Sequence, residues 1–145
     1  MKVTLKQISG LAMAAVADSN HWVAMDGPER LGGFSAGARP MELLLMGLAG
    51  CTAIDVVSIL TKKRARLTEF SIEVEAQEAT DYPKVFTDIR LRYTLKGDNL
   101  RKADVETALK LSENKYCSAM AIFRETARIV SDYEIVESEV SLKDS

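Results

Sequence analysis

The chain has 145 residues, of which 47% are hydrophobic and 28% are charged, and its formal net charge is -2. This balance fits a single globular domain over residues 1–145 and argues against long disorder. The weak negative charge, without a basic block, argues against nucleic-acid binding. The opening MKVTLKQISG lacks the basic start and apolar run of a signal peptide. We therefore expect a cytoplasmic protein that does not enter the membrane.

The first part of the chain has the composition of short β-strands. Apolar-rich runs at 3–8, 11–17 and 21–25 are separated by turn residues, Ser9-Gly10 and then residues 18–20. A glycine-rich loop over 26–40 follows. Because it is longer than most connections, it is a candidate functional loop.

A long helix is predicted from Pro40 to about Lys63. Proline is tolerated in a first helical turn, and Glu42 suits the positive end of the helix dipole. The apolar stretch 43–60 approaches the length of a membrane span, but Asp55 within it would be costly in a bilayer. We therefore expect a helix that is buried on nearly all sides in a soluble protein, or at a subunit interface.

The rest of the chain alternates runs of strands and helices. Residues 70–77 and 89–95 show a period of two, which predicts two half-buried strands. A helix is expected over 101–114, a shorter one from Cys117 to Arg124, and a strand over 128–137, before a polar, frayed end at 138–145. One side of the first of these helices is expected to carry Val105, Ala108, Leu109, Ser112 and Tyr116. Because strands occur in adjacent runs, the fold class is α+β.

Two cysteines, Cys51 and Cys117, are the candidate reactive groups. A thiolate can attack a peroxide to give a sulfenic acid, and a second thiol can condense with it to a disulfide. Such chemistry needs two cysteines that converge in space. Their number alone favours inert buried thiols, since free cysteine packs as a small hydrophobe.

The sequence around each cysteine resembles a known family. Pro40–Asp55 (PMELLLMGLAGCTAID) and Leu111–Ser118 (LSENKYCS) are similar to the two cysteine segments of the OsmC/Ohr superfamily, nearest to its YhfA-like branch. The resemblance implies an α+β fold with antiparallel sheets wrapped around a long buried central helix. It also implies an intertwined homodimer with active sites between subunits.

The same resemblance implies an activity, the reduction of organic hydroperoxides. Cys51 would be peroxidatic and Cys117 resolving, and a dithiol, such as a lipoyl group, would be the reductant. No metal and no organic cofactor is implied.

Two further residues, Glu42 and Arg39, are candidates for tuning the thiolate. In Ohr proteins a glutamate directly after the motif's proline holds an arginine that activates the first cysteine. Here Glu42 comes one place later and lies half a turn out of phase with Cys51, so it serves the other subunit or simply the helix terminus. Because residues 1–29 contain no arginine, Arg39 is the first substitute, ahead of Arg30.

Asp55 follows Cys51 by one helical turn on the same face. We favour a structural role for it between the central helices of a dimer, because a negative charge would oppose formation of the Cys51 thiolate. Cys117 lies near a predicted helix N-terminus, which favours a thiolate. His21 is the only histidine, which disfavours a histidine-based zinc site.

A different class of function stays open beside the peroxidase. The chain could be a non-catalytic dimeric module of the same fold that senses redox state or binds an apolar ligand. The displaced glutamate and the missing early arginine favour this alternative. The presence of both cysteine segments, Pro40–Asp55 and Leu111–Ser118, favours the peroxidase.

Overall fold

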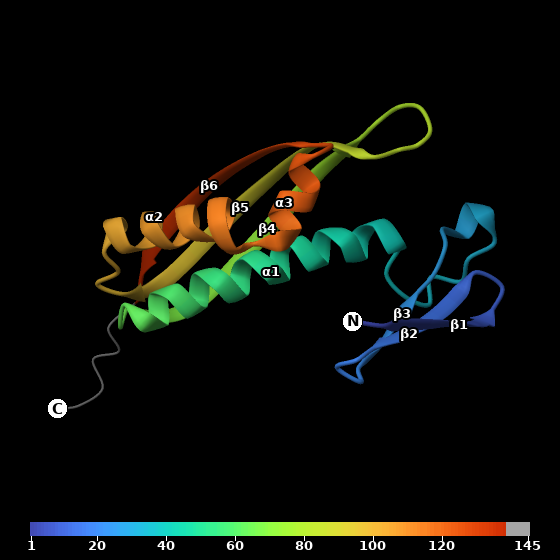
Figure 1. Cartoon of the computed structure of the whole chain (residues 1–145), viewed down its shortest axis with the longest axis horizontal. Helices are drawn as coiled ribbons and strands as arrows, with labels where there is room; N and C mark the ends of the chain where they lie inside the picture. The colour runs from blue at the N-terminus through green and yellow to red at the C-terminus, as the bar shows by residue number, and fades with distance from the viewer. Residues whose placement is uncertain (139–145) are drawn as a thin grey trace. The chain divides into compact units, whose positions relative to one another are not determined.

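The computed structural model describes residues 1–138, so the predicted frayed end falls outside the described residues except for Ser138. The chain forms two compact units, Met1–Met46 and a second that begins at Gly47 (Figure 1). The order of elements is three strands, a long helix, two strands, two helices and a strand. The predicted α+β class is confirmed.

The first unit is built on an antiparallel three-stranded sheet. Its strands are β1 (Val3–Ser9), β2 (Ala12–Ala17) and β3 (Trp22–Met25), in that spatial order. Gly10, with φ of 55°, makes the turn between β1 and β2, in a left-handed region that favours glycine. In this sheet only Ala12 and Ala15 are buried, and the other apolar side chains are half-buried or exposed.

Asp26 organises the loop that follows β3. Its carboxylate accepts hydrogen bonds from the backbone N–H groups of Gly27, Phe34 and Ala36, at 2.7, 2.8 and 3.2 Å. The Phe34 N–H contributes most to lowering the pKa of Asp26, and the amides together outweigh burial, which raises it. The long loop is therefore an ordered turn with its own polar centre.

Helix α1 (Pro40–Lys62) begins and ends close to its predicted bounds. The Glu42 carboxylate accepts a hydrogen bond of 2.8 Å from the backbone N–H of Arg39, the residue before the helix. This contact satisfies an amide that has no partner within the helix, as in a capping box. The boundary between the two compact units lies within α1, after Met46.

The second unit contains a mixed sheet of β4 (Arg66–Glu78), β5 (Phe86–Asp98) and β6 (Arg128–Glu137), with β5 in the centre. β4 and β5 pair antiparallel, whereas β5 and β6 pair parallel. The expectation of purely antiparallel sheets is thus wrong for β6. The helical connection carries the chain back so that β6 runs in the same direction as β5.

The connection between β5 and β6 consists of α2 (Lys102–Leu111), a π-helical turn η2 (Ser112–Tyr116) and α3 (Ser118–Arg124). A regular helix over 101–114 is therefore wrong at its C-terminal end. Four of the five residues predicted on its buried side are buried, but Tyr116 is 50% exposed. The wider π-turn rotates Tyr116 away from the face that a regular helix would give it.

The core of the second unit lies between the sheet and one stripe of α1. The alternate residues Ile89, Leu91, Tyr93 and Leu95 of β5 are buried. The buried stripe of α1 consists of Leu48, Thr52, Val56 and Leu60.

Helix α1 is covered on this stripe only. Its length and mean hydropathy of 2.1 would also fit a membrane span. Burial on nearly all sides is nevertheless wrong for the single chain, since Ile54 is 72% exposed and Val57 is exposed as well. The elements of the second unit pack against one side of the helix, and the opposite side is left apolar and uncovered.

Candidate active site

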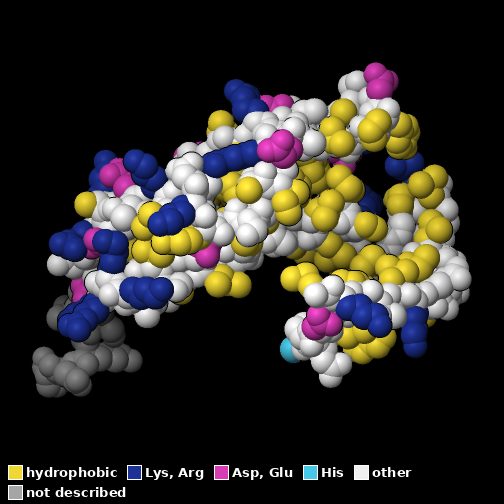
Figure 2. All heavy atoms as spheres, in the orientation of Figure 1, with side chains coloured by type: hydrophobic (Ala, Val, Ile, Leu, Met, Phe, Trp, Pro, Cys, Tyr) yellow, Lys and Arg dark blue, Asp and Glu magenta, His cyan; other side chains and the backbone are white. Residues whose placement is uncertain are grey.

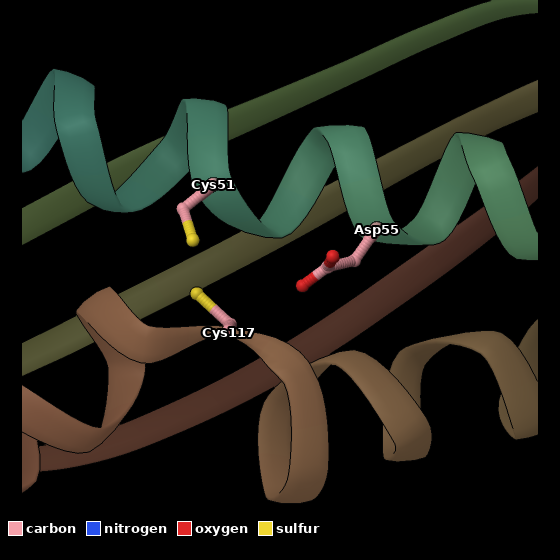
Figure 3. A group of neighbouring side chains, drawn as sticks. All are labelled: Cys51, Asp55 and Cys117. Carbon is pink, nitrogen blue, oxygen red and sulfur yellow. The ribbon is translucent and has the colours of Figure 1, made fainter.

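The two cysteines, distant in sequence, meet in the second unit. The sulfur atoms of Cys51 and Cys117 and a carboxylate oxygen of Asp55 all lie within 4.8 Å of one another (Figure 3). Helix α1 supplies Cys51 and Asp55, and Cys117 lies at the junction of η2 and α3. Both thiols are free. The convergence expected of a redox pair is therefore present.

Cys117 is the more enclosed of the two thiols, with only 4% of the residue exposed. Its sulfur accepts a hydrogen bond from the backbone N–H of Met120 and lies 3.4 Å from the hydroxyl oxygen of Thr52. Burial is the largest influence and raises the pKa of Cys117, while Thr52 and the Met120 amide lower it and Cys51 raises it further. The predicted benefit of a helix N-terminus is thus outweighed by burial.

Cys51 is only half-buried, so it is the thiol that a molecule from solvent reaches first. The pair is therefore an accessible thiol facing an enclosed one.

Asp55 finds its hydrogen-bond partner within its own chain. The Ser112 hydroxyl donates to Asp55 Oδ2 at 3.3 Å and lies 3.4 Å from the backbone carbonyl of Thr52. The Ser112 carbonyl in turn accepts the backbone N–H of Cys117 at 2.9 Å. The π-turn therefore fixes both the Asp55 carboxylate and the backbone of Cys117.

A second polar contact anchors the same turn to the sheet. The buried Tyr93 hydroxyl, on β5, donates to the Glu113 carboxylate at 2.9 Å. Burial, followed by the charge of Glu113, raises the pKa of Tyr93. Sequence reasoning did not single out Thr52, Tyr93 or Glu113. Thr52 and Glu113 stand inside the two cysteine segments, and the alternation of β5 already placed Tyr93 on its buried face.

Arg39 and Glu42 belong to the first compact unit, whereas Cys51 and Cys117 belong to the second. Glu42 is engaged at the start of α1, which matches its predicted role at the helix terminus. The Arg39 side chain is exposed and makes no ion pair within residues 1–138. Arg30 and His21 are exposed too.

An open pocket of about 370 Å³ borders the cluster at Asp55. Its walls are mainly apolar and include Ile59, Leu111 and Tyr116, together with Lys62 and Lys63, and neither cysteine lines it. Solvent and small molecules therefore have a route to the carboxylate that stands beside the two sulfurs.

The family of the chain follows from its sequence relatives. The family described as "OsmC-like protein" matches residues 32–131, which is more than half of the chain. Protein YhfA of Escherichia coli (strain K12) is 34% identical over 136 residues, covering 94% of this chain and 98% of that protein.

Solved structures share the fold. A hypothetical protein from Aquifex aeolicus VF5 superposes with a TM-score of 0.84 at 25% identity, covering 95% of this chain and 97% of that one. The organic hydroperoxide resistance protein OhrB of Bacillus subtilis superposes with a TM-score of 0.61 at 14% identity, covering 92% and 98%. At that identity the likeness to OhrB concerns the fold.

Proposed function

Since the chain belongs to the OsmC-like family, in its YhfA-like branch, we propose that it is a thiol peroxidase that reduces organic hydroperoxides. The observation that carries this proposal is the convergence of two free cysteine sulfurs, from separate segments, within 4.8 Å. A disulfide needs sulfurs about 2.05 Å apart, so only a small movement separates the reduced pair from an oxidised one.

The reaction has three steps. The Cys51 thiolate attacks an oxygen of the O–O bond, which breaks, so that Cys51 becomes a sulfenic acid and the alkoxide takes a proton and leaves as an alcohol. The Cys117 thiolate then attacks the Cys51 sulfur, and hydroxide leaves and is protonated to water. Finally an external dithiol, for which a lipoyl group is our candidate, returns two electrons and two protons to the disulfide.

Burial supports this division of roles. Cys51 is half-buried and Cys117 is enclosed, so Cys51 is the peroxidatic and Cys117 the resolving cysteine. A resolving thiol does not need to meet the peroxide, only the sulfenic acid beside it. The raised pKa of Cys117 is tolerable in that role, because the step is intramolecular.

The substrate class rests on the pocket and on a structural neighbour. The pocket of about 370 Å³ lies within the usual range of small-molecule sites and is lined by Asp55, one helical turn from Cys51. Its mainly apolar walls suit a lipophilic peroxide better than hydrogen peroxide. The Bacillus subtilis neighbour is named for organic hydroperoxide resistance. We therefore propose an alkyl or aryl hydroperoxide as the substrate.

Single-turnover oxidation tests the proposal. Reduced protein is mixed with cumene hydroperoxide or with hydrogen peroxide, and free thiols and intact mass are followed. We expect faster oxidation by cumene hydroperoxide and a loss of two hydrogens per chain. Cys51→Ser should abolish this reaction, whereas Cys117→Ser should gain one oxygen atom and stop there. Thiols that survive for hours would instead favour the apolar-ligand-binding module.

The cation that activates Cys51 stays a sequence-based proposal, with Arg39 as the candidate. Arg39→Ala should slow the oxidation of Cys51, whereas the same change at Arg30, another exposed arginine of the loop before α1, should not. Equal rates for the two variants would remove Arg39 from the mechanism.

We also propose that the protein is a homodimer. Exposed apolar residues stand along α1, namely Leu44, Met46, Ile54 and Val57. Hydrophobic side chains reach the visible surface in both units (Figure 2). Apolar surface of this kind in a soluble protein usually marks an interface. Sedimentation equilibrium should give twice the mass of one chain.

A further inference from the structure

We propose that the reduced protein binds a thiophilic divalent cation, such as Zn²⁺, through Cys51, Cys117 and Asp55. These three side chains are the group of potential ligands whose sulfur and oxygen atoms lie within 4.8 Å of one another (Figure 3). Two thiolates and one carboxylate form a donor set that Zn²⁺ accepts and that Mg²⁺ or Ca²⁺ does not favour.

The spacing of the donors fits one tetrahedral ion. Cys51 and Asp55 are four residues apart on α1, so they project from one face of the helix, and Cys117 approaches from the opposite side. Bonds of about 2.3 Å to sulfur and 2.0 to 2.2 Å to oxygen place tetrahedral donors roughly 3.5 to 4 Å apart. Donors already within 4.8 Å need to move by only about 1 Å.

Two of the three proposed ligands, Asp55 and Cys117, also accept a hydrogen bond that orients them. The Ser112 hydroxyl donates to the Asp55 carboxylate, and the Met120 amide donates to the Cys117 sulfur. Such outer contacts hold metal ligands in place and are part of most protein metal sites. They come from the π-turn and from α3, so the two sides of the site are fixed by separate elements.

Charge favours a cation at this point. When Zn²⁺ binds, the two thiols release their protons to solvent, and two thiolates and a carboxylate face a doubly charged ion. Lys62 and Lys63 line the neighbouring pocket, but within the described residues Asp55 forms no ion pair with a lysine or arginine, so its charge is available to the ion. The pocket beside Asp55 gives the ion an approach from the carboxylate side. A water molecule would complete the tetrahedral set.

One consequence rests on the proposed function. The ion and the disulfide need the same two sulfurs, so metal binding and peroxide reduction exclude each other. Zinc would hold the pair reduced and block the attack of Cys51 on a hydroperoxide. The metal site itself does not depend on peroxidase activity, and it is measured without any peroxide.

Competition with a chromophoric chelator tests the site. Full-length reduced, metal-stripped protein is titrated with Zn²⁺, and we expect one ion per chain. Co²⁺ in its place should give thiolate-to-cobalt charge-transfer absorption and the visible bands of tetrahedral coordination. Protein oxidised with diamide to the disulfide should bind neither ion.

Asp55→Asn, which keeps the shape of the side chain, should lower zinc affinity at least about tenfold. The matched control is Asp81→Asn, at an exposed carboxylate in the connection between β4 and β5, and it should bind like the parent. Circular dichroism establishes that each variant is folded. Two results would overturn the proposal: no zinc bound while both thiols are free, or equal affinities for Asp55→Asn and the parent.

Discussion

Tyr93 links the central strand of the second unit to the turn that carries Cys117. Its hydroxyl is buried and donates to Glu113, one residue beyond Ser112. Removing the hydroxyl leaves the carboxylate partly buried without this donor. Hydrogen bonds to charged groups contribute about 1.5 to 3 kcal/mol, and partial hydration of Glu113 reduces this.

Tyr93→Phe should therefore lower the free energy of unfolding by about 1 to 2 kcal/mol, measured by urea denaturation. Tyr133→Phe is the matched control, because Tyr133 makes the same kind of contact with Glu106 at the surface. That variant should lose less stability. If both variants unfold at the same urea concentration, the Tyr93–Glu113 contact does not anchor the turn.

The fold gives the two cysteines different environments. Both carry the same thiol group, so their side-chain chemistry alone does not distinguish them. Cys51 is half-buried on a helix, whereas Cys117 is enclosed and contacts Thr52 and the Met120 amide. The difference in exposure on which the proposed roles rest is thus created by packing, and it would not exist in the unfolded chain.

At the scale of elements, Glu42 at the start of α1 has two possible roles. It can cap the helix, or its charge can help to activate the Cys51 thiol. As a cap, the residue needs only an oxygen that accepts the Arg39 N–H. Glutamine keeps such an oxygen and loses the charge, whereas alanine loses both. Glu42→Ala should cost at most about 1 kcal/mol of stability at this exposed helix end, and Glu42→Gln less.

Peroxide oxidation gives the second readout for Glu42. A cap alone predicts that Glu42→Gln reacts with cumene hydroperoxide at the parental rate. A large fall in that rate for a variant of nearly unchanged stability would show instead that the carboxylate charge activates the thiol, as in Ohr proteins.

Periodicity in the sequence located the elements, because burial repeats every two residues in a strand and every three to four in a helix. The buried face of β5 followed from it, whereas the start of α1 was indicated by Pro40. The direction of β6 did not follow from periodicity, since a strand has the same alternation whether it pairs parallel or antiparallel. The sequence pattern also does not reveal the π-turn at Ser112–Tyr116, because one wide turn is too short to show a period.

The residues of the candidate site could be predicted from the sequence, but their contacts with one another could not. Cys51 and Cys117 were identified by the segments around them, and their convergence is confirmed. Asp55 was expected to have a structural role between the helices of a dimer, whereas its carboxylate accepts a hydrogen bond from Ser112 of the same chain. That the partner is Ser112 depends on how α1 lies against the turn, which is a tertiary fact that local sequence does not encode.

At the scale of the whole molecule, each compact unit contains a buried carboxylate that ties separate segments together. Asp26 gathers three backbone amides of the loop in the first unit. In the second, Asp104 at the start of α2 pairs with Arg101 and with Lys63, just beyond α1. Arg101, then Lys63, lower the pKa of Asp104, and the amides lower that of Asp26.

Both shifts make the fold sensitive to acid. A carboxylate whose folded pKa lies below the ordinary value of 3.8 stabilises the folded state fully above that value. This contribution is lost as the pH falls through the folded pKa. Both units should therefore lose stability below about pH 4, and neutral solution should leave both contributions intact.

Asn substitutions test this at each carboxylate separately. Asp26→Asn and Asp104→Asn should be less stable than the parent at pH 7, because asparagine accepts fewer hydrogen bonds and carries no charge. The difference in free energy of unfolding between the parent and each variant should decrease as the pH is lowered through 4 toward 3. The parent then loses the charge that the variant already lacks. Urea denaturation at each pH measures this difference. If this difference stays constant down to pH 3, these carboxylates are not the cause of the loss of stability in acid.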